Sequence, residues 1–223
     1  MTMTTIIDHD DPAWAFRWER LGQNRWNGAY YYSREIVENI VPRVDTDRPW
    51  VTVNQKDRCL DRAIVFIHSN IDAGQYEWLR RYDDLVLVCG VPQTCETLAR
   101  IGRTVYLPLS VDVAYVKQFA VEHKDRWRAI VGRKSKVASC IPEGADAVYG
   151  LRREKFLAEI ARYREVYAVG RCAIEARALG CDILPYDSRY PDPSLWQVVD
   201  NAEAAAMLQR ILDEVDGIER AQP

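Results

Sequence analysis

The sequence lacks the paired cysteines by which zinc sites and disulfide frameworks are recognised. Its six cysteines include no CxxC pair, and Cys89 and Cys181 stand inside apolar, strand-like runs. Scattered cysteines of this kind are typical of buried thiols in a reducing compartment. We therefore expect neither a disulfide-stapled fold nor a metal held by the protein.

A secretion signal and a membrane-spanning run are missing as well. No apolar stretch reaches the ~18 residues that a membrane span requires. The amino-terminal stretch MTMTTIIDHDDPAW has neither the basic start nor the apolar centre of a signal peptide. We therefore expect a cytoplasmic protein without a transmembrane segment.

The familiar nucleotide-binding loops and a basic surface are also lacking. The chain contains neither GxGxxG nor GxxxxGK[ST], which argues against a standard NAD enzyme and a Walker loop. Its net charge of −3 does not indicate a nucleic-acid partner. Histidine is scarce, with three residues, so each one is worth inspecting as a catalytic group.

What the chain does contain is a regular alternation of strand and helix patterns. Runs of apolar and β-branched residues indicate buried strands, and segments with one apolar face indicate helices. Strands are predicted at 49–54, 63–68, 84–90, 104–110, 127–131, 146–151, 166–170 and from Ile183, with a weaker candidate at 14–20. Helices are predicted at 73–82, 92–102, 152–163, 171–179 and 201–217. The stretch 27–44 is predicted as a loop at Asn27-Gly28 followed by a helix, and 111–123 as a helix and a linker.

This alternation predicts an α/β fold with mainly parallel sheets flanked by helices. Because the pattern restarts near residue 124, we expect two small Rossmann-like halves. Their predicted limits are 1–122 and 123–223, with the last helix packing across. One continuous doubly wound sheet is the alternative.

Ligands of open parallel sheets bind beyond the carboxyl ends of the strands, so the loops there are the first candidates. Asn27-Gly28 precedes a predicted helix and would let a ligand approach its start, although Asn-Gly is also a common turn. His68 follows the strand AIVFI and is suited to a catalytic base, with a capping or core histidine as the alternative. Asp112, after another strand, is best explained as a helix cap.

Two further loops carry positive charge. Arg133, Lys134 and Lys136 follow the strand WRAIV and are suited to gripping a diphosphate, unless they form a basic surface turn. Gly170 and Arg171 open a small-residue helix whose first N–H groups can receive a phosphate.

Glu175 lies one turn into that same helix, in the stretch GRCAIEARALGCDILPYD. A carboxylate at this place is suited to accepting hydrogen bonds from the vicinal hydroxyls of a ribose. A solvated helix glutamate is the alternative.

The stretch from 141 to 184 resembles the nucleotide-binding half of GT-B glycosyltransferases of the family 4-like group. AIVGRKSK is similar to the family's basic strand-loop, YGLRREKFLAEIARY to its next helix, and AIEARALGCDIL to its EA-x-A-x-G helix and strand. More loosely, NGAYYYSREIV is similar to the family's glycine loop, and VYLPLSVD to its P-x-VD element.

The resemblance implies a compact sugar transferase that uses a nucleotide-diphosphate sugar as donor, with an unknown acceptor and no fixed cofactor. It implies that Glu175 holds the donor ribose, that Arg133 with Lys134 or Lys136 holds its diphosphate, and that His68 lies near the transferred sugar. Tyr167 stands where retaining members carry the first glutamate of an E-x7-E pair. A non-catalytic nucleotide- or glycan-binding protein, or another nucleotide-sugar enzyme such as an epimerase, is therefore the alternative.

Overall fold

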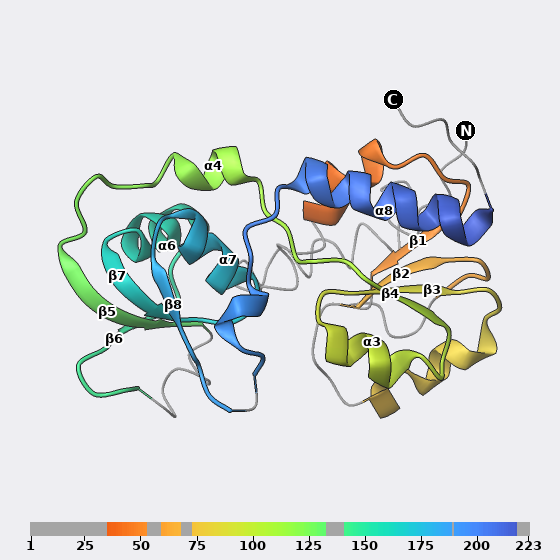
Figure 1. The fold of residues 1–223 in the computed structure, drawn as a ribbon, viewed down its shortest axis with the longest axis horizontal. Coiled ribbons are helices and arrows are strands. Elements are labelled where there is room, and N and C mark those ends of the chain that lie inside the picture. Colours follow the sequence, from red (N-terminus) through yellow and green to blue (C-terminus); the bar gives the residue numbers. More distant parts are fainter. Residues whose placement is uncertain (1–34, 53–58, 68–72, 133–140, 189, 218–223) are drawn as a thin grey trace. The chain divides into compact units, whose positions relative to one another are not determined.

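A computed structural model describes residues 35–52, 59–67, 73–132, 141–188 and 190–217 of the chain. They form two compact units (Figure 1). The first contains the described residues of Met1–Pro108 and Ala202–Pro223, and the second those of Leu109–Asn201. Each unit is built on a four-stranded parallel sheet flanked by helices. The prediction of two Rossmann-like halves is therefore confirmed.

The first sheet consists of four short parallel strands that follow one another in chain order. They are β1 (Trp50–Thr52), β2 (Ile64–Ile67), β3 (Val86–Cys89) and β4 (Arg103–Tyr106). Every residue of β2 and β3 is buried, because helices cover both faces of the sheet. This explains why these two strands appear in the sequence as continuous apolar runs.

The helices of the first unit lie on the two sides of this sheet (Figure 1). On one side are α3 (Pro92–Leu98) and the 3-10 helix η3 (Ala73–Arg81). On the other are the π-helical turn η1 (Ile36–Ile40), the 3-10 turn η2 (Val41–Arg43) and the long helix α8 (Asn201–Asp216). The last helix of the chain thus returns to the first unit.

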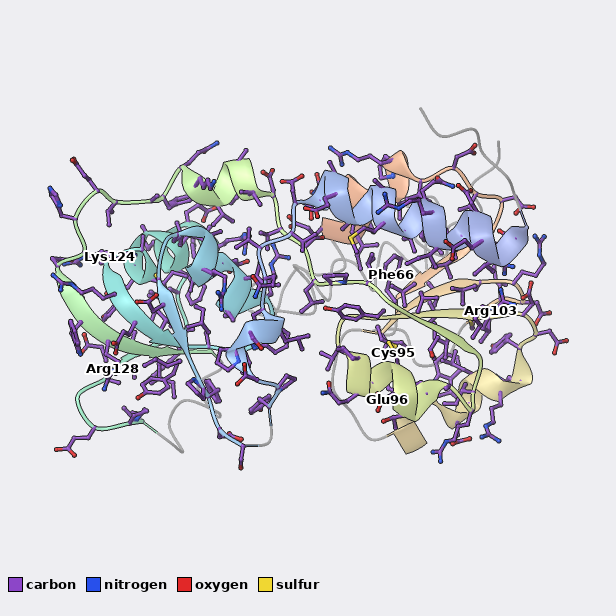
Figure 2. All side chains as sticks on the ribbon, viewed as in Figure 1. Phe66, Cys95, Glu96, Arg103, Lys124 and Arg128 are labelled. Carbon is purple, nitrogen blue, oxygen red and sulfur yellow. The ribbon has the colours of Figure 1, made fainter. Side chains whose placement is uncertain are left out.

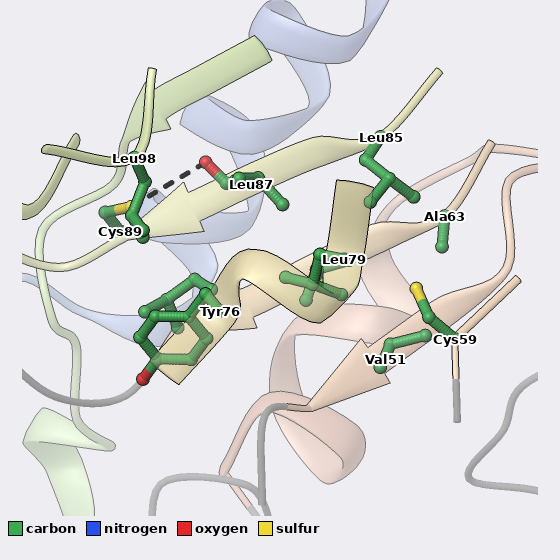
Figure 3. Packing of buried hydrophobic residues seen from close by; sticks show 11 residues of the cluster. Val51, Cys59, Ala63, Tyr76, Leu79, Leu85, Leu87, Cys89 and Leu98 are labelled. Carbon is green, nitrogen blue, oxygen red and sulfur yellow. Dashed lines mark hydrogen bonds between the residues drawn. The ribbon is translucent and has the colours of Figure 1, made fainter. Parts of the chain in front are cut away.

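The main core of the first unit lies between the sheet and the pair η3 and α3 (Figure 3). Leu79 of η3 and Leu98 of α3 pack there against Leu87 of β3, and all three are fully buried. On the opposite side of the sheet, the rings of Trp50 and Phe66 stack with their centroids 5.8 Å apart. Apolar burial on both faces provides the main stabilisation of this unit.

A buried arginine ties α8 to the loops of the first unit. The side chain of Arg48 is 3% exposed, and its Nη2 lies 2.6 Å from Asp216 Oδ1 and 3.0 Å from Asp84 Oδ2. Its Nη1 donates to the main-chain oxygens of Arg62 and Asp84. Both of these residues have positive φ, 59° and 51°. Arg48 therefore stabilises two strained turns and the end of α8 together.

The second sheet has the strand order β6-β5-β7-β8, with all pairs parallel. Its strands are β5 (Arg126–Val131), β6 (Asp146–Val148), β7 (Tyr163–Tyr167) and β8 (Asp182–Leu184). Because the strands are parallel, the loops after β6, β7 and β8 all leave from one edge of the sheet. That edge is the candidate ligand-binding region of this unit.

Helices α6 (Arg153–Ile160) and α7 (Arg171–Ala178) lie on one face of the second sheet (Figure 1), and the short α4 (Val113–Lys117) packs against α7. The 3-10 turn η4 (Pro193–Leu195) follows later in the chain. Asp112 caps α4 by accepting a hydrogen bond from the Tyr115 N–H at 2.8 Å, which confirms its predicted role.

Lys124, labelled in Figure 2, satisfies the carboxyl ends of both long helices of the second unit. Its Nζ donates to Ala161 O at 2.9 Å and to Leu179 O at 3.0 Å. These carbonyls follow the last residues of α6 and α7, where a positive charge is favoured. Lys124 therefore ties the carboxyl ends of α6 and α7 together.

The structure corrects several predicted element limits. The strand predicted at 166–170 is β7 at Tyr163–Tyr167, and the preceding helix ends at Ile160. The start of this strand was missed because the charged residues Arg164 and Glu165 interrupt its apolar run. In the structure, Glu165 accepts a hydrogen bond from Arg128 on β5. In the predicted helix 27–44, the backbone changes to a 3-10 turn where Pro42 removes an N–H donor.

The division into units also differs from the predicted one. Residues 109–122 belong to the second unit, and α8 belongs to the first apart from its first residue. The polar contacts of α8 explain the latter difference: Gln209 Nε2 donates to Asp45 O, and Asp216 pairs with Arg48. The strand candidate at 14–20 and the first part of the helix 27–44 lie outside the described residues.

Candidate functional site

The strongest candidate site lies at the carboxyl edge of the second sheet, where α6 and α7 begin. Each helix starts with an arginine: Arg153 is the first residue of α6 and Arg171 the first residue of α7. The first N–H groups of a helix have no partner within it and carry partial positive charge. Two helix starts and two guanidinium groups therefore gather at one edge of the sheet.

Glu175 joins these two arginines from inside α7. Its Oε1 lies 2.5 Å from Arg153 Nη1 and 2.7 Å from Arg171 Nε. The side chain of Glu175 is only 2% exposed, and those of Arg153 and Arg171 are 12% and 10% exposed. A carboxylate this deeply buried is found where it is paired, so the alternative of a solvated helix glutamate is excluded.

Two guanidinium groups contact one carboxylate in this cluster. Short hydrogen bonds between ions hold planar guanidinium groups in a fixed orientation. The Arg153 guanidinium also lies over the ring of Tyr115 in α4, at 5.8 Å from its centroid. The cluster of Glu175, Arg153 and Arg171 thus holds two guanidinium groups in fixed orientations, which suits an anionic ligand.

Gly170 allows α7 to begin where it does. It caps the helix with φ 60° and ψ −136°, a backbone conformation open to glycine and costly for other residues. Its carbonyl oxygen accepts the first hydrogen bonds of the helix, from the N–H groups of Ala173 and Ile174. A Cβ at this position would meet Leu109 Cδ1 only at 3.8 Å, so the requirement for glycine is conformational and not steric.

Aromatic side chains lie around the carboxyl ends of β7 and β8. Tyr186 and Tyr190 pack edge to face with their centroids 5.4 Å apart. Buried Ile130 of the central strand β5 and Tyr186 form one cluster, and Tyr190 and Tyr167, at the end of β7, pack against it. Tyr167 therefore has a packing role at the position where retaining members of the resembled family carry the first glutamate of the E-x7-E pair.

The structure brings together three of the predicted site residues and leaves the others undescribed. Gly170, Arg171 and Glu175 form one cluster, as their common helix requires. The remaining predicted site residues lie outside the described part of the chain: Asn27, Gly28, His68, Arg133, Lys134 and Lys136. Their assignments to catalysis, to a glycine loop and to diphosphate binding stay predictions.

Arg153 is the site residue that the sequence analysis missed. The available signal was the basic pair Arg152-Arg153, placed after a predicted strand and at the start of a predicted helix. Gly170-Arg171 occupies the equivalent position in the next strand-helix unit, between the end of the strand and the start of the helix. Recognising the repetition would have predicted two arginines at one edge of the sheet.

Comparisons with known proteins add no identity. No protein-family model matches the chain. No curated protein matches it. Within the described ranges, no helix is both long and apolar enough to cross a membrane, and no group of three or more His, Cys, Asp and Glu side chains is placed to hold a metal ion.

Proposed function

We propose that the protein is a sugar transferase whose second unit binds the diphosphate of a nucleotide-sugar donor. The observation that carries this proposal is the buried carboxylate of Glu175 holding Arg153 and Arg171 at the starts of two helices. Helix starts and guanidinium pairs are the groups that proteins use to bind phosphate oxygens. The resemblance of residues 141–184 to the donor half of GT-B glycosyltransferases supports the same ligand.

In this proposal the two arginines stabilise the negative charge that develops on the diphosphate as its bond to the sugar breaks. Breaking the bond between the sugar and the diphosphate transfers negative charge to the phosphate oxygens. Fixed cationic groups lower the barrier because they need no reorganisation at that moment. The hydrogen bonds of Glu175 to Arg153 and Arg171 provide that fixed orientation.

The observed contacts of Glu175 suggest a role different from the ribose contact expected from the sequence. Because its Oε1 accepts hydrogen bonds from both arginines, Glu175 is best explained as a positioning residue for the diphosphate-binding groups. Contact with the donor ribose, implied by the resemblance, stays a prediction. His68, which directly follows β2, remains the proposed catalytic group on the grounds of its sequence position.

Calorimetric titration with UDP, GDP, ADP, CMP and dTDP tests donor binding. We expect one nucleoside diphosphate to saturate the wild-type protein. Loss of one charged hydrogen-bonding group costs about 1.5–3 kcal/mol, so Arg153→Ala and Arg171→Ala should each weaken binding roughly 10- to 150-fold. Arg164→Ala is the matched control, because Arg164 is an exposed arginine near the amino end of β7. If Arg153→Ala and Arg171→Ala bind the nucleoside diphosphate as tightly as Arg164→Ala and the wild type, the two arginines do not bind the diphosphate.

A protein that binds the donor without transferring the sugar is the second candidate. It is favoured by Tyr167, which packs in the aromatic group beside Ile130 where retaining members of the resembled family carry a carboxylate. Incubation with the nucleotide sugar that binds best separates the two functions. Release of the nucleoside diphosphate, measured by chromatography and lost in Arg171→Ala, supports a transferase; tight binding without any release supports the binding protein.

A further inference from the structure

A pair of neighbouring thiols lies in the first unit, at the carboxyl end of its sheet. Cys89 is the last residue of β3 and is fully buried, and Cys95 is a partly buried residue of α3 (Figure 2). The Cys89 sulfur lies 3.9 Å from the carbonyl oxygen of Leu87. The Cys95 sulfur lies 4.0 Å from the carbonyl oxygen of Cys89, and Cys95 packs against the core cluster that contains Cys89. No other pair of cysteines in the described part of the chain shares such a contact.

The two thiols differ in their readiness to ionise. The hydrogen bond from Cys89 lowers the pKa of Cys95, which is opposed by partial burial and by the charge of Glu96. The same hydrogen bond, together with burial, raises the pKa of Cys89. Burial and the negative charge of Cys95 raise the pKa of Tyr106, whose β4 strand pairs with β3 at Cys89. Cys95 is therefore the thiol of the pair that ionises more readily, and it is also the more accessible of the two.

We propose that Cys89 and Cys95 form a redox pair, in which Cys95 attacks a hydroperoxide and Cys89 resolves the product as an intramolecular disulfide. The thiolate sulfur of Cys95 attacks one peroxide oxygen, the O–O bond breaks, and the leaving hydroxide takes a proton to become water. The sulfur of Cys89 then displaces the hydroxyl group from the sulfenic acid of Cys95, and a second water leaves. In sum, two thiols and hydrogen peroxide give one disulfide and two waters.

The position of the pair gives the disulfide a structural consequence. It joins the end of β3 to α3 across the connecting turn, at the edge of the first sheet where ligands of parallel sheets bind. The core beneath this edge contains Leu87 and Leu98, which flank the two cysteines in sequence (Figure 3). Oxidation therefore fixes the start of α3 to a buried strand. This inference is independent of the proposed donor site in the second unit.

Peptide mapping tests the proposal on the full chain. The folded protein is treated with hydrogen peroxide, quenched, unfolded and alkylated without reduction. Trypsin then releases residues 82–100 as one peptide that contains both cysteines. We expect the mass of this peptide to fall by two hydrogen atoms and neither cysteine to be alkylated. Reduction before alkylation should make both cysteines reactive again. A peptide that stays fully alkylatable while other cysteines oxidise would overturn the proposal.

Single variants assign the two roles. Cys89→Ser removes the resolving thiol, so the sulfenic acid of Cys95 should accumulate and react with dimedone. Cys95→Ser removes the attacking thiolate, so the peptide 82–100 should stay unoxidised. Cys172→Ser, which changes a partly buried cysteine of the second unit, should leave the disulfide yield unchanged. The assignment is contradicted if dimedone labels Cys89 in the Cys95→Ser variant. It is also contradicted if dimedone does not label Cys95 in the Cys89→Ser variant. The wild-type mapping decides even where a variant does not fold.

Discussion

Arg153 Nη1 lies 2.5 Å from Glu175 Oε1, although the two residues belong to different helices of the second unit. Arg171 shares that oxygen from the first turn of α7. From the sequence alone, Glu175 could be described only as solvent-facing or ligand-facing. Its burial against two arginines indicates a third role, in which the glutamate holds the groups that we propose to bind the ligand.

Removing the Glu175 carboxylate should destabilise the second unit, because it removes a buried ion-pair partner of two nearly buried guanidiniums. Breaking a buried ion pair costs about 3–5 kcal/mol, and we expect Glu175→Ala to lose an amount of this order in urea unfolding. Glu175→Gln keeps the shape and one acceptor, so it should lose less. Equal stability of Glu175→Ala and wild type would show that the carboxylate is not part of a buried cluster.

Gly170→Ala should reduce both stability and diphosphate binding. The conformation of Gly170, with φ 60° and ψ −136°, costs a residue with a Cβ about 1–3 kcal/mol, and relief of that strain would shift the start of α7. Gly144→Ala is the matched control, because Gly144 has φ +73° and a Cβ placed there would meet no atom within 4 Å. Both variants should lower the unfolding midpoint, while only Gly170→Ala weakens nucleotide binding. Parallel losses of affinity in both would contradict a local role for Gly170.

Replacing Arg48 should destabilise the first unit. Lysine cannot reproduce the fork that contacts two carboxylates and two main-chain oxygens. We expect Arg48→Lys to lose more than about 2 kcal/mol in urea unfolding. Arg62→Lys is the control, since the Arg62–Asp47 pair is exposed and such pairs contribute about 0–1 kcal/mol. Similar losses in both variants would show that burial of Arg48 adds nothing.

Alkaline pH should destabilise the second unit through Tyr163. Burial is the main cause that raises the pKa of Tyr163 to about 12, above its usual value of 10.0, and its hydroxyl donates to Asp146. A folded-state pKa above the unfolded one means that the folded form retains a proton which the unfolded form has lost. Stability should therefore be constant below about pH 10 and fall between pH 10 and 12. In Tyr163→Phe, the free energy of unfolding should fall less between pH 10 and 12 than in wild type. Parallel pH profiles of the two proteins would exclude ionisation of Tyr163 as the cause of the loss.

Much of the fold was predictable because the buried strands carry their signal in composition. The runs AIVFI and DLVLVC coincide with β2 and β3, whose residues are covered from both sides. β7 was placed too late, since its Arg164 and Glu165 break the apolar run while Glu165 pairs with Arg128 on β5. Such cross-strand pairs depend on sheet order, which a single sequence does not contain.

The candidate site was predictable only in part, for a similar reason. Gly170, Arg171 and Glu175 stand on one helix, and their proximity follows from its spacing. Arg153 comes from another helix and reaches Glu175 only because α6 and α7 pack on the same face of the sheet. The return of α8 to the first unit likewise depends on Arg48 and Asp216, which are 168 residues apart.

The most direct test of the central claim is a calorimetric titration with inorganic pyrophosphate, the smallest ligand that presents a donor diphosphate. The account predicts saturable binding to wild type and to Arg164→Ala, with affinity reduced roughly 10- to 150-fold in Arg153→Ala and in Arg171→Ala. Circular dichroism of each variant establishes that it is folded. Unchanged pyrophosphate affinity in folded Arg153→Ala and Arg171→Ala would contradict the proposal that these arginines bind the diphosphate.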